Sequence, residues 1–101
     1  MIFRRARFAS VIRTQLELFQ RVHRDVIEDA RAHRRRYSAS PREEAEEAYG
    51  DYVDALETGT EILADLRDHF ARSLEDDAAE RYVREFNSAV ARRLPEFALE
   101  K

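Results

Sequence analysis

The chain contains no cysteine and no tryptophan, and only two glycines and two prolines among its 101 residues. The absence of cysteine excludes disulfide bonds, cysteine-ligated metals and thiol chemistry. No apolar run approaches the roughly 18 residues that a membrane-spanning helix needs. Because glycine, proline and β-branched residues are all scarce, the composition argues against a β-sheet protein and favours helices.

Charge and apolar content indicate one compact domain. Apolar residues make up 44% of the sequence, which is enough for one core, and charged residues make up 39%, well above the usual quarter. The 18 basic and 21 acidic residues are interspersed, so the net charge of −3 gives no strong preference for nucleic acid. We therefore expect a single all-α domain over residues 1–101, located in the cytoplasm.

Apolar residues in the first third of the chain recur at steps of three and four, as on one face of a helix. The series runs Phe8, Ile12, Leu16, Phe19, Val26, Ala30 and Tyr37, with His23 and His33 filling the remaining positions. Residues 1–16 contain four arginines and no acid, as transit segments do, but the apolar spacing continues past them. The spacing predicts one long helix over about residues 2–37.

A turn is expected next. Ser40 and Glu43 have the spacing of a capping box, and Pro41 suits the first helical position. The apolar series then resumes and predicts a second helix over about residues 41–73, antiparallel to the first. Gly59 lies on this series, and we expect the helix to continue through it. The alternative is a break at Gly59, which would give four helices in place of a three-helix bundle.

A third helix is predicted over about residues 76–94, followed by a short tail over residues 95–101. This helix is too short to cover the whole hairpin, so the half near the turn keeps an apolar, tyrosine-bearing face. That face consists of Val26, Ala30, Tyr37, Ala45, Tyr49, Tyr52 and Val53. Tyrosine is enriched at protein interfaces. We expect self-association through this face, as a dimer or higher oligomer that completes the bundle, or binding of a protein partner.

Two series of carboxylates and histidines occur at steps of four residues, which places each series on one helix face. They are Asp25, Asp29 and His33 in the first helix, and Glu57, Glu61, Asp65 and His69 in the second. Helical bundles build metal sites from such residues, so a divalent metal at an oligomer interface is one alternative. The competing interpretation is a pair of solvated helix faces, and no other cofactor is expected.

Arginines cluster near the N-terminus at Arg4, Arg5 and Arg7, close to Phe3 and Phe8. Basic residues beside aromatic ones can bind nucleic acid or rest on an anionic membrane surface. This is the second alternative, although the balanced net charge favours neither a nucleic acid nor a membrane as partner.

No arrangement typical of an enzyme is found in the sequence. It has no cysteine nucleophile, no Gly-x-Ser-x-Gly elbow and no phosphate-binding loop. A helical domain of this size also offers little room for a deep pocket. The leading expectation is therefore a non-catalytic helical protein that works by interaction or assembly.

Overall fold

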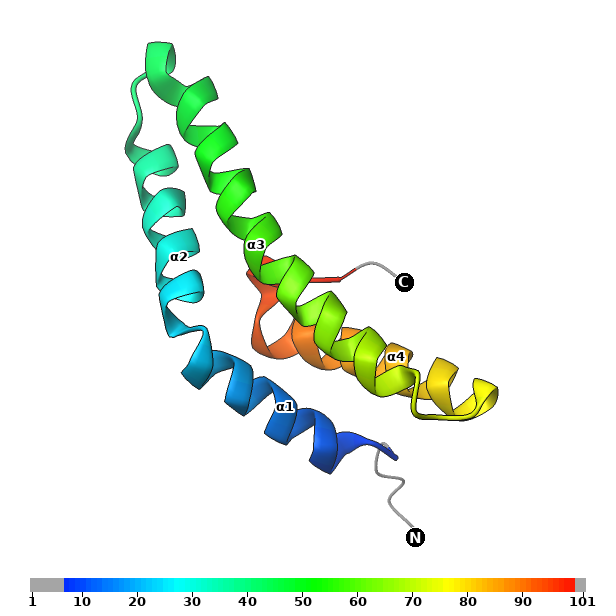
Figure 1. Cartoon of the computed structure of the whole chain (residues 1–101). Helices are drawn as coiled ribbons and strands as arrows, with labels where there is room; N and C mark the ends of the chain where they lie inside the picture. Colours follow the sequence, from blue (N-terminus) through cyan, green and yellow to red (C-terminus); the bar gives the residue numbers. More distant parts are fainter. Residues whose placement is uncertain (1–6, 100–101) are drawn as a thin grey trace, which may run out of the picture.

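A computed structural model describes residues 7–99 of the chain. Its elements are α1 (Ala9–Val22), α2 (Arg24–Ala39), the 3₁₀ helix η1 (Arg42–Glu44), α3 (Ala45–Ala71), α4 (Asp76–Arg93) and the 3₁₀ helix η2 (Pro95–Phe97) (Figure 1). No strand occurs within residues 7–99, so the all-α prediction is confirmed. No helix in this part of the chain is both long enough and apolar enough to cross a membrane.

The molecule has two regions that share α3. We call residues 24–58 the arm; there α2 runs antiparallel to the first half of α3. We call α1, the second half of α3, α4 and η2 the body. In Figure 1 the arm rises at the top, and α4 lies behind α3 in the body below it. The described part of the chain measures 54 × 32 × 24 Å, and the arm projects well beyond the body (Figure 1).

The first long helix is broken at His23, and the prediction of one helix over residues 2–37 is therefore wrong. The backbone of His23 has φ −111° and ψ 35°, which are not helical values. Proline and glycine, the usual causes of a kink, are absent there. At this point the chain changes its neighbour: α1 packs against α4, whereas α2 packs against α3, and we therefore attribute the break to tertiary packing. Residues 2–6 lie outside the described part.

Helix α3 runs without interruption through Gly59, as expected. The fourth helix thus comes from the break at His23. Gly59 is buried under the ring of Phe97 from η2. A methyl group added at Gly59 would lie 2.7 Å from Cδ1 and 3.0 Å from Cζ of that ring. The missing side chain is what lets η2 fold back onto α3.

The turn between α2 and α3 is present, but the predicted capping box is wrong. The Ser40 hydroxyl donates to the Arg36 carbonyl at 2.7 Å, so it belongs to the end of α2. Pro41 precedes η1, and α3 begins at Ala45 instead of near residue 41. The last residue of α3 is Ala71, close to the predicted end.

Helix α4 supplies three large side chains of the body core, Tyr82, Phe86 and Val90. Its Tyr82 is fully buried against the rings of Phe8, Phe70 and Phe86, with centroids 4.7–5.8 Å away. The largest fully buried side chains are Leu16, Leu63, Tyr82, Phe86, Val90, Leu94 and Phe97. In the arm the buried side chains are mostly small: Ile27, Ala30, Ala48 and Ala55.

A side chain of α4 holds the backbone that leads into α1. The Glu85 carboxylate accepts hydrogen bonds from the backbone N–H groups of Arg7 at 3.2 Å and Phe8 at 2.8 Å, and also from Arg81. Burial by itself would raise the pKa of Glu85, but these hydrogen bonds outweigh it and lower the pKa below its ordinary value. Glu85 thus ties the start of α1 to α4 and gives the backbone N–H groups of Arg7 and Phe8 an acceptor.

Candidate functional site

The predicted interface tyrosines lie together near the tip of the arm. The Tyr37 ring is 5.1 Å from Tyr49 and 6.3 Å from Tyr52, the latter pair stacked at 15°. Tyr37 is 38% exposed and Tyr49 is 51% exposed. The three rings therefore stabilise the contact between α2 and α3. Tyr49 also keeps half of its surface exposed, which leaves it available to a partner.

The other predicted interface residues differ in how much surface they offer. Val26, Ala45 and Val53 are half-buried and border the contact between α2 and α3. Ala30 is only 1% exposed, because it is enclosed within the arm. Its inclusion in an interface is therefore corrected: Ala30 holds the hairpin together and is not available to a second molecule.

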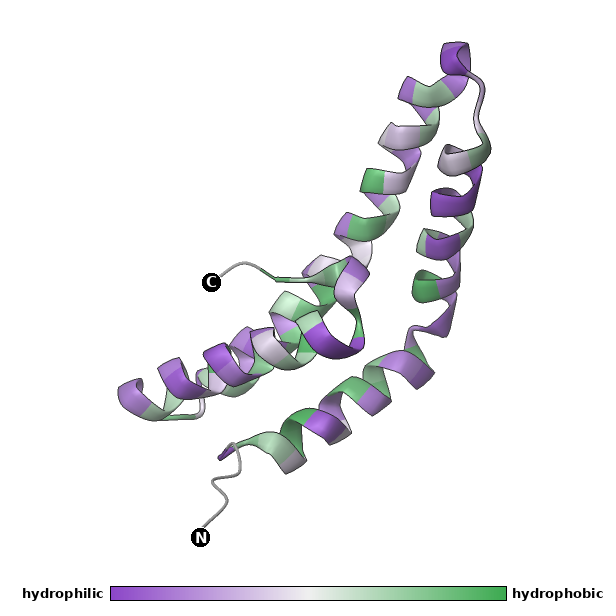
Figure 2. Cartoon of the chain, turned by 180° about the vertical axis from the view of Figure 1, so that it is seen from behind, coloured by the Kyte–Doolittle hydropathy of each residue, from purple (hydrophilic) through white to green (hydrophobic). Residues whose placement is uncertain are grey.

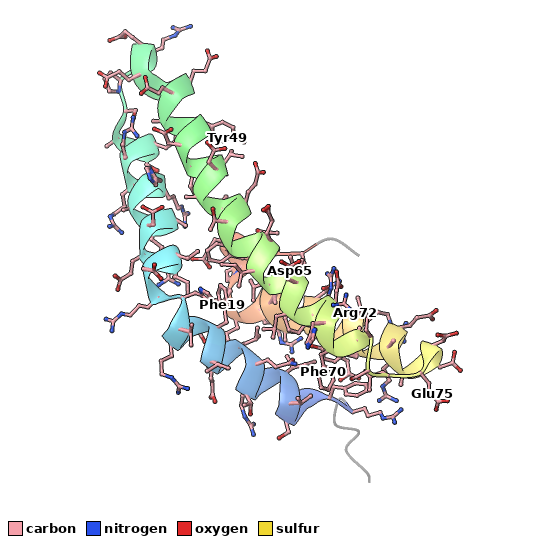
Figure 3. All side chains as sticks on the ribbon, in the orientation of Figure 1. Phe19, Tyr49, Asp65, Phe70, Arg72 and Glu75 are labelled. Atoms are coloured by element: carbon pink, nitrogen blue, oxygen red, sulfur yellow. The ribbon has the colours of Figure 1, made fainter. Side chains whose placement is uncertain are left out.

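A more exposed apolar surface lies on the body, where the sequence pattern predicted none. Leu18 is 46% exposed and Val22 is 58% exposed, one turn apart on α1. They border a hollow of about 140 Å³ between α1 and α3. We call this surface the seam, and its lining residues are Gln15, Leu18, Phe19, Val22, His23, Ile62 and Leu66. Phe19 is labelled in Figure 3, between the two helices.

The seam is open because the apolar face of α1 is wider than the surface that α4 covers. Ile12 and Leu16 face α4 and are buried, whereas Leu18 and Val22 lie on the neighbouring part of the same helix face. The signal was available in the sequence, since Leu18 and Val22 have i, i+4 spacing beside the main series. It was missed because a straight hairpin would have placed α1 directly against α3.

A second hollow of about 280 Å³ follows in the arm, between α2 and α3. Asp25, Val26 and Asp29 line it from α2, and Ala55 and Thr58 line it from α3. Thr58 precedes Ile62 by one turn of α3, so this hollow lies next to the seam along α3.

The carboxylates and histidines proposed as metal ligands do not form a cluster. His33 Nε2 lies 3.5 Å from Asp29 Oδ1, as an ordinary i, i+4 pair. Glu57, Glu61, Asp65 and His69 are exposed on α3. Within residues 7–99, no three histidine or acidic side chains are placed to hold one metal ion.

Of the predicted basic patch, Arg4 and Arg5 lie outside the described residues. Arg7 is exposed, and its guanidinium lies 5.2 Å from the centre of the Phe8 ring. Its backbone N–H is held by Glu85.

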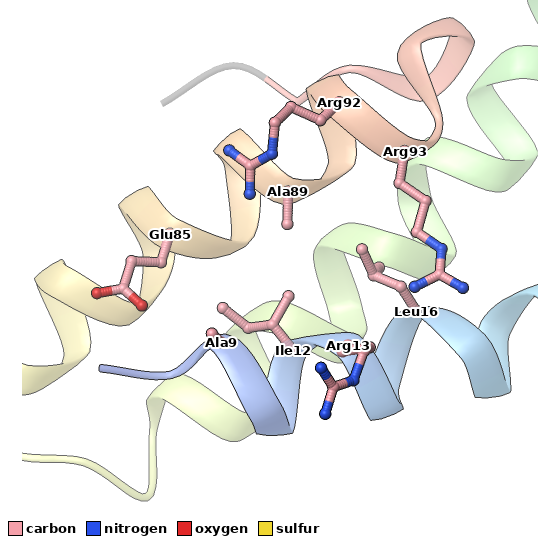
Figure 4. Close-up of a pocket in the computed structure, with 8 residues that line it drawn as sticks. All are labelled: Ala9, Ile12, Arg13, Leu16, Glu85, Ala89, Arg92 and Arg93. Atoms are coloured by element: carbon pink, nitrogen blue, oxygen red, sulfur yellow. The ribbon is translucent and has the colours of Figure 1, made fainter. Parts of the chain in front are cut away.

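The structure gathers other arginines into a surface that we call the basic track. Three hollows of about 310, 560 and 440 Å³ follow one another along α1, α2 and the end of α4. The first and second hollows share Arg93, and the second and third share Arg31. Figure 4 shows the first hollow, with Arg13, Arg92 and Arg93 around an apolar floor. The arginines of the track are Arg13, Arg21, Arg24, Arg31, Arg34, Arg35, Arg92 and Arg93.

The track has a surplus of positive charge. Its four carboxylates are Glu17, Glu28, Glu85 and Glu96. Each of them is already paired with an arginine, for example Arg31 with Glu96 at 3.0 Å. Within the described part of the chain, the arginines of the track without an ion pair are Arg13, Arg21, Arg34, Arg35 and Arg92. The track is therefore a strongly basic surface on a chain whose net charge is negative.

Comparisons of the chain with protein-family models, with curated proteins and with solved structures gave no match. The functional assignment therefore depends on the seam, the tyrosine cluster and the basic track.

Proposed function

We propose that the chain is a non-catalytic assembly protein that self-associates by packing the seam of one copy against the seam of a second copy. The observation that carries this proposal is the exposure of Leu18 and Val22 beside an apolar hollow. Large aliphatic side chains grouped on a surface mark interaction sites more often than scattered ones do.

Charge at the two edges of the seam favours a second copy as the occupant. Arg21 lies on the α1 edge next to Leu18, and Asp65 lies on the α3 edge next to Ile62; both are exposed. A two-fold axis would place α1 of each copy against α3 of the other, because such an interface is self-complementary. Arg21 of one copy would then face Asp65 of the other.

The expected association is weak. Full burial of one leucine or valine side chain contributes about 1.5–3 kcal/mol, and about half of that surface is already buried here. Two copies together supply four such side chains, from which the cost of association must be subtracted. We therefore expect a dimer with a dissociation constant in the micromolar range or weaker.

The test compares two variants with the same added charge. Leu18→Glu combined with Val22→Glu places carboxylates in the seam, whereas Ser10→Glu combined with Ser88→Glu places them on exposed positions outside the seam and outside the basic track. Sedimentation over a concentration series should show a dimer for the natural chain and the control, and a monomer for the seam variant. Circular dichroism checks that all three are folded. A natural chain that stays monomeric at the highest concentration would overturn the proposal.

A further inference from the structure

Helix α3 carries a continuous acidic face. Asp54, Glu57, Glu61, Asp65 and Asp68 follow one another at steps of three and four residues, so they share one side of the helix. All five are exposed, and they lie on the side opposite the buried Gly59 and Leu63. Asp68 is paired with Arg67 at 2.8 Å, and the other four make no ion pair with any residue from 7 to 99.

This face and the basic track reflect a separation of charge along the chain. Between Ala9 and Ala39 there are seven arginines and four carboxylates. Between Arg42 and Ala71 there are ten carboxylates and two arginines. The near-neutral composition thus conceals one strongly basic and one strongly acidic surface. In Figure 2, the view with α4 in front, hydrophilic residues predominate along the arm.

The two surfaces cannot neutralise each other within one copy. The acidic face points away from the core on α3, whereas the track runs along α1, α2 and the end of α4. Unpaired arginines and unpaired carboxylates therefore remain on different sides of the same molecule. Each surface is complementary in charge to the other one on a neighbouring molecule.

We propose that the basic track of one copy binds the acidic face of α3 in a second copy. This inference extends the proposed assembly function, and its two surfaces share only the edge residues Arg21 and Asp65 with the seam. Guanidinium groups bind carboxylates through paired, directional hydrogen bonds. The acidic face from Asp54 to Asp68 is about 21 Å long at 1.5 Å per residue, which suits an elongated track better than a single pocket.

The shape of the track favours a helix over a nucleic acid as its occupant. The floor of its first hollow is apolar, formed by Ile12 and Leu16 together with two alanines, and Ile27 lies in the second. An amphipathic helix can cover such a floor, whereas a phosphate backbone cannot. Tyrosine and phenylalanine do not occur among the described lining residues, so the track offers no stacking platform for bases.

The contact joins the basic track of one copy to the acidic face of another. Each pair of copies therefore keeps one free basic track and one free acidic face. Interfaces of this head-to-tail type continue into rings or filaments. The seam, by contrast, closes a dimer. The two contacts also differ in salt dependence, because exposed charges are screened within about 8 Å at physiological ionic strength whereas apolar burial is not weakened.

The experiment reverses each surface and then mixes the two variants. The acidic-face variant is Asp54→Lys, Glu57→Lys and Glu61→Lys; the track variant is Arg34→Glu, Arg35→Glu and Arg92→Glu. Neither removes a residue from an ion pair seen in residues 7–99. The matched control for the track variant is Arg42→Glu, Arg72→Glu and Arg84→Glu. It makes the same charge change on exposed residues outside the track.

Light scattering at low salt, about one fifth of physiological ionic strength, should show species larger than a dimer for the natural chain and the control. Each reversed variant alone should lose these species, with association at least about tenfold weaker. Mixing the two reversed variants should restore them, because each surface then meets an opposite charge. Raising the salt about tenfold should leave only the seam dimer of the natural chain.

The seam variant described above keeps both charged surfaces, so its salt-dependent association should persist even though its dimer is lost. If the seam variant is monomeric at every salt concentration, or if mixing the reversed variants restores nothing, the charge contact is wrong. A short duplex DNA serves as a second probe at the same low salt. If it binds the natural chain and the control but not the track variant, and the natural chain forms no large species, the track serves a nucleic acid instead.

Discussion

The arm and the body pack the same helix in different ways. In the arm, α3 has α2 as its partner and meets it through small buried residues, Ala48 and Ala55. In the body, α3 meets α4 and η2 through Leu63 and through the ring of Phe97 over Gly59. A helix is stabilised mainly by the face it buries, so the body should be the more stable region.

Polar and aromatic contacts join the two helices of the arm in addition to its small buried residues. Arg36 donates to Asp51 at 2.6 Å across the two helices, and Tyr37 stacks on Tyr52. The hydrogen bond that Arg36 donates to Asp51 raises the pKa of Arg36 above its ordinary value. Such exposed pairs add little stability. The two glycines of α3, one in each region, allow this difference to be measured directly.

The largest expected change in stability comes from replacing Gly59, the glycine in the body. Gly59→Ala would press a methyl group into the buried ring of Phe97, which has little room to move. Overpacking of this kind costs about 2–3 kcal/mol, more than the roughly 1 kcal/mol that alanine gains over glycine in a helix. Urea unfolding followed by circular dichroism should therefore show a clear loss of stability. Adding Phe97→Leu should recover part of it, and an increase in stability from Gly59→Ala alone would contradict the packing described here.

The next effect concerns Tyr82 in the body core. Burial raises the pKa of Tyr82 to about 12, although its hydrogen bond to Gln15 acts in the opposite direction. Because the folded state holds this proton more tightly than the unfolded state, its contribution is complete below about pH 10 and is lost as the pH rises toward 12. The loss amounts to on the order of 2–3 kcal/mol.

Measurements of unfolding free energy against pH test this expectation. Tyr82→Phe should remove the alkaline loss that comes from this side chain, while costing some stability at every pH because Gln15 loses its donor. Tyr49→Phe in the arm is the control, since Tyr49 is half exposed. An unchanged alkaline slope in Tyr82→Phe would show that another group is responsible.

The junction of α1 with α4 gives a smaller effect. Glu85→Gln should cost about 1–2 kcal/mol at neutral pH, because a charged acceptor for two backbone N–H groups becomes a neutral one. Since the pKa of Glu85 is lowered in the folded state, its contribution is present above the ordinary glutamate range and is lost as the pH falls through the lowered pKa. Glu80→Gln, an exposed change on the same helix, is the control. If the two variants lose the same free energy of unfolding as the pH falls, Glu85 does not hold these N–H groups.

The parts of the fold that could be predicted from the sequence are those set by local spacing. The apolar steps of three and four correctly located α3, including its passage through Gly59, and α4. The break at His23 could not be predicted, because we attribute it to the packing of α1 against α4, an element much later in the chain. For the same reason the sequence indicated the tyrosines of the arm but not the seam, whose exposure depends on the angle between α1 and α3.

The basic track shows the same limit. Arg93 and Arg31 are 62 residues apart, and nothing local in the sequence predicts that they line one hollow. The clusters Arg4 to Arg7 and Arg34 to Arg36 are obvious as runs, whereas most of the track is assembled from single arginines on three helices. Spacing within a helix therefore predicts a face, and only the packing of helices decides which faces combine.

The smallest expected effect lies in the arm and completes the glycine pair. Gly50 is exposed in the middle of a helix, and a methyl group added there would meet nothing within 4 Å. Gly50→Ala should therefore stabilise the arm by about 0.5–1 kcal/mol, through helix propensity and the reduced entropy of the unfolded chain. If the arm opens independently of the body, hydrogen exchange should slow for amides of α2 and the first half of α3 and stay unchanged around Tyr82. Equal slowing in both regions would show that arm and body unfold as one unit, and the distinction between them would then be structural but not energetic.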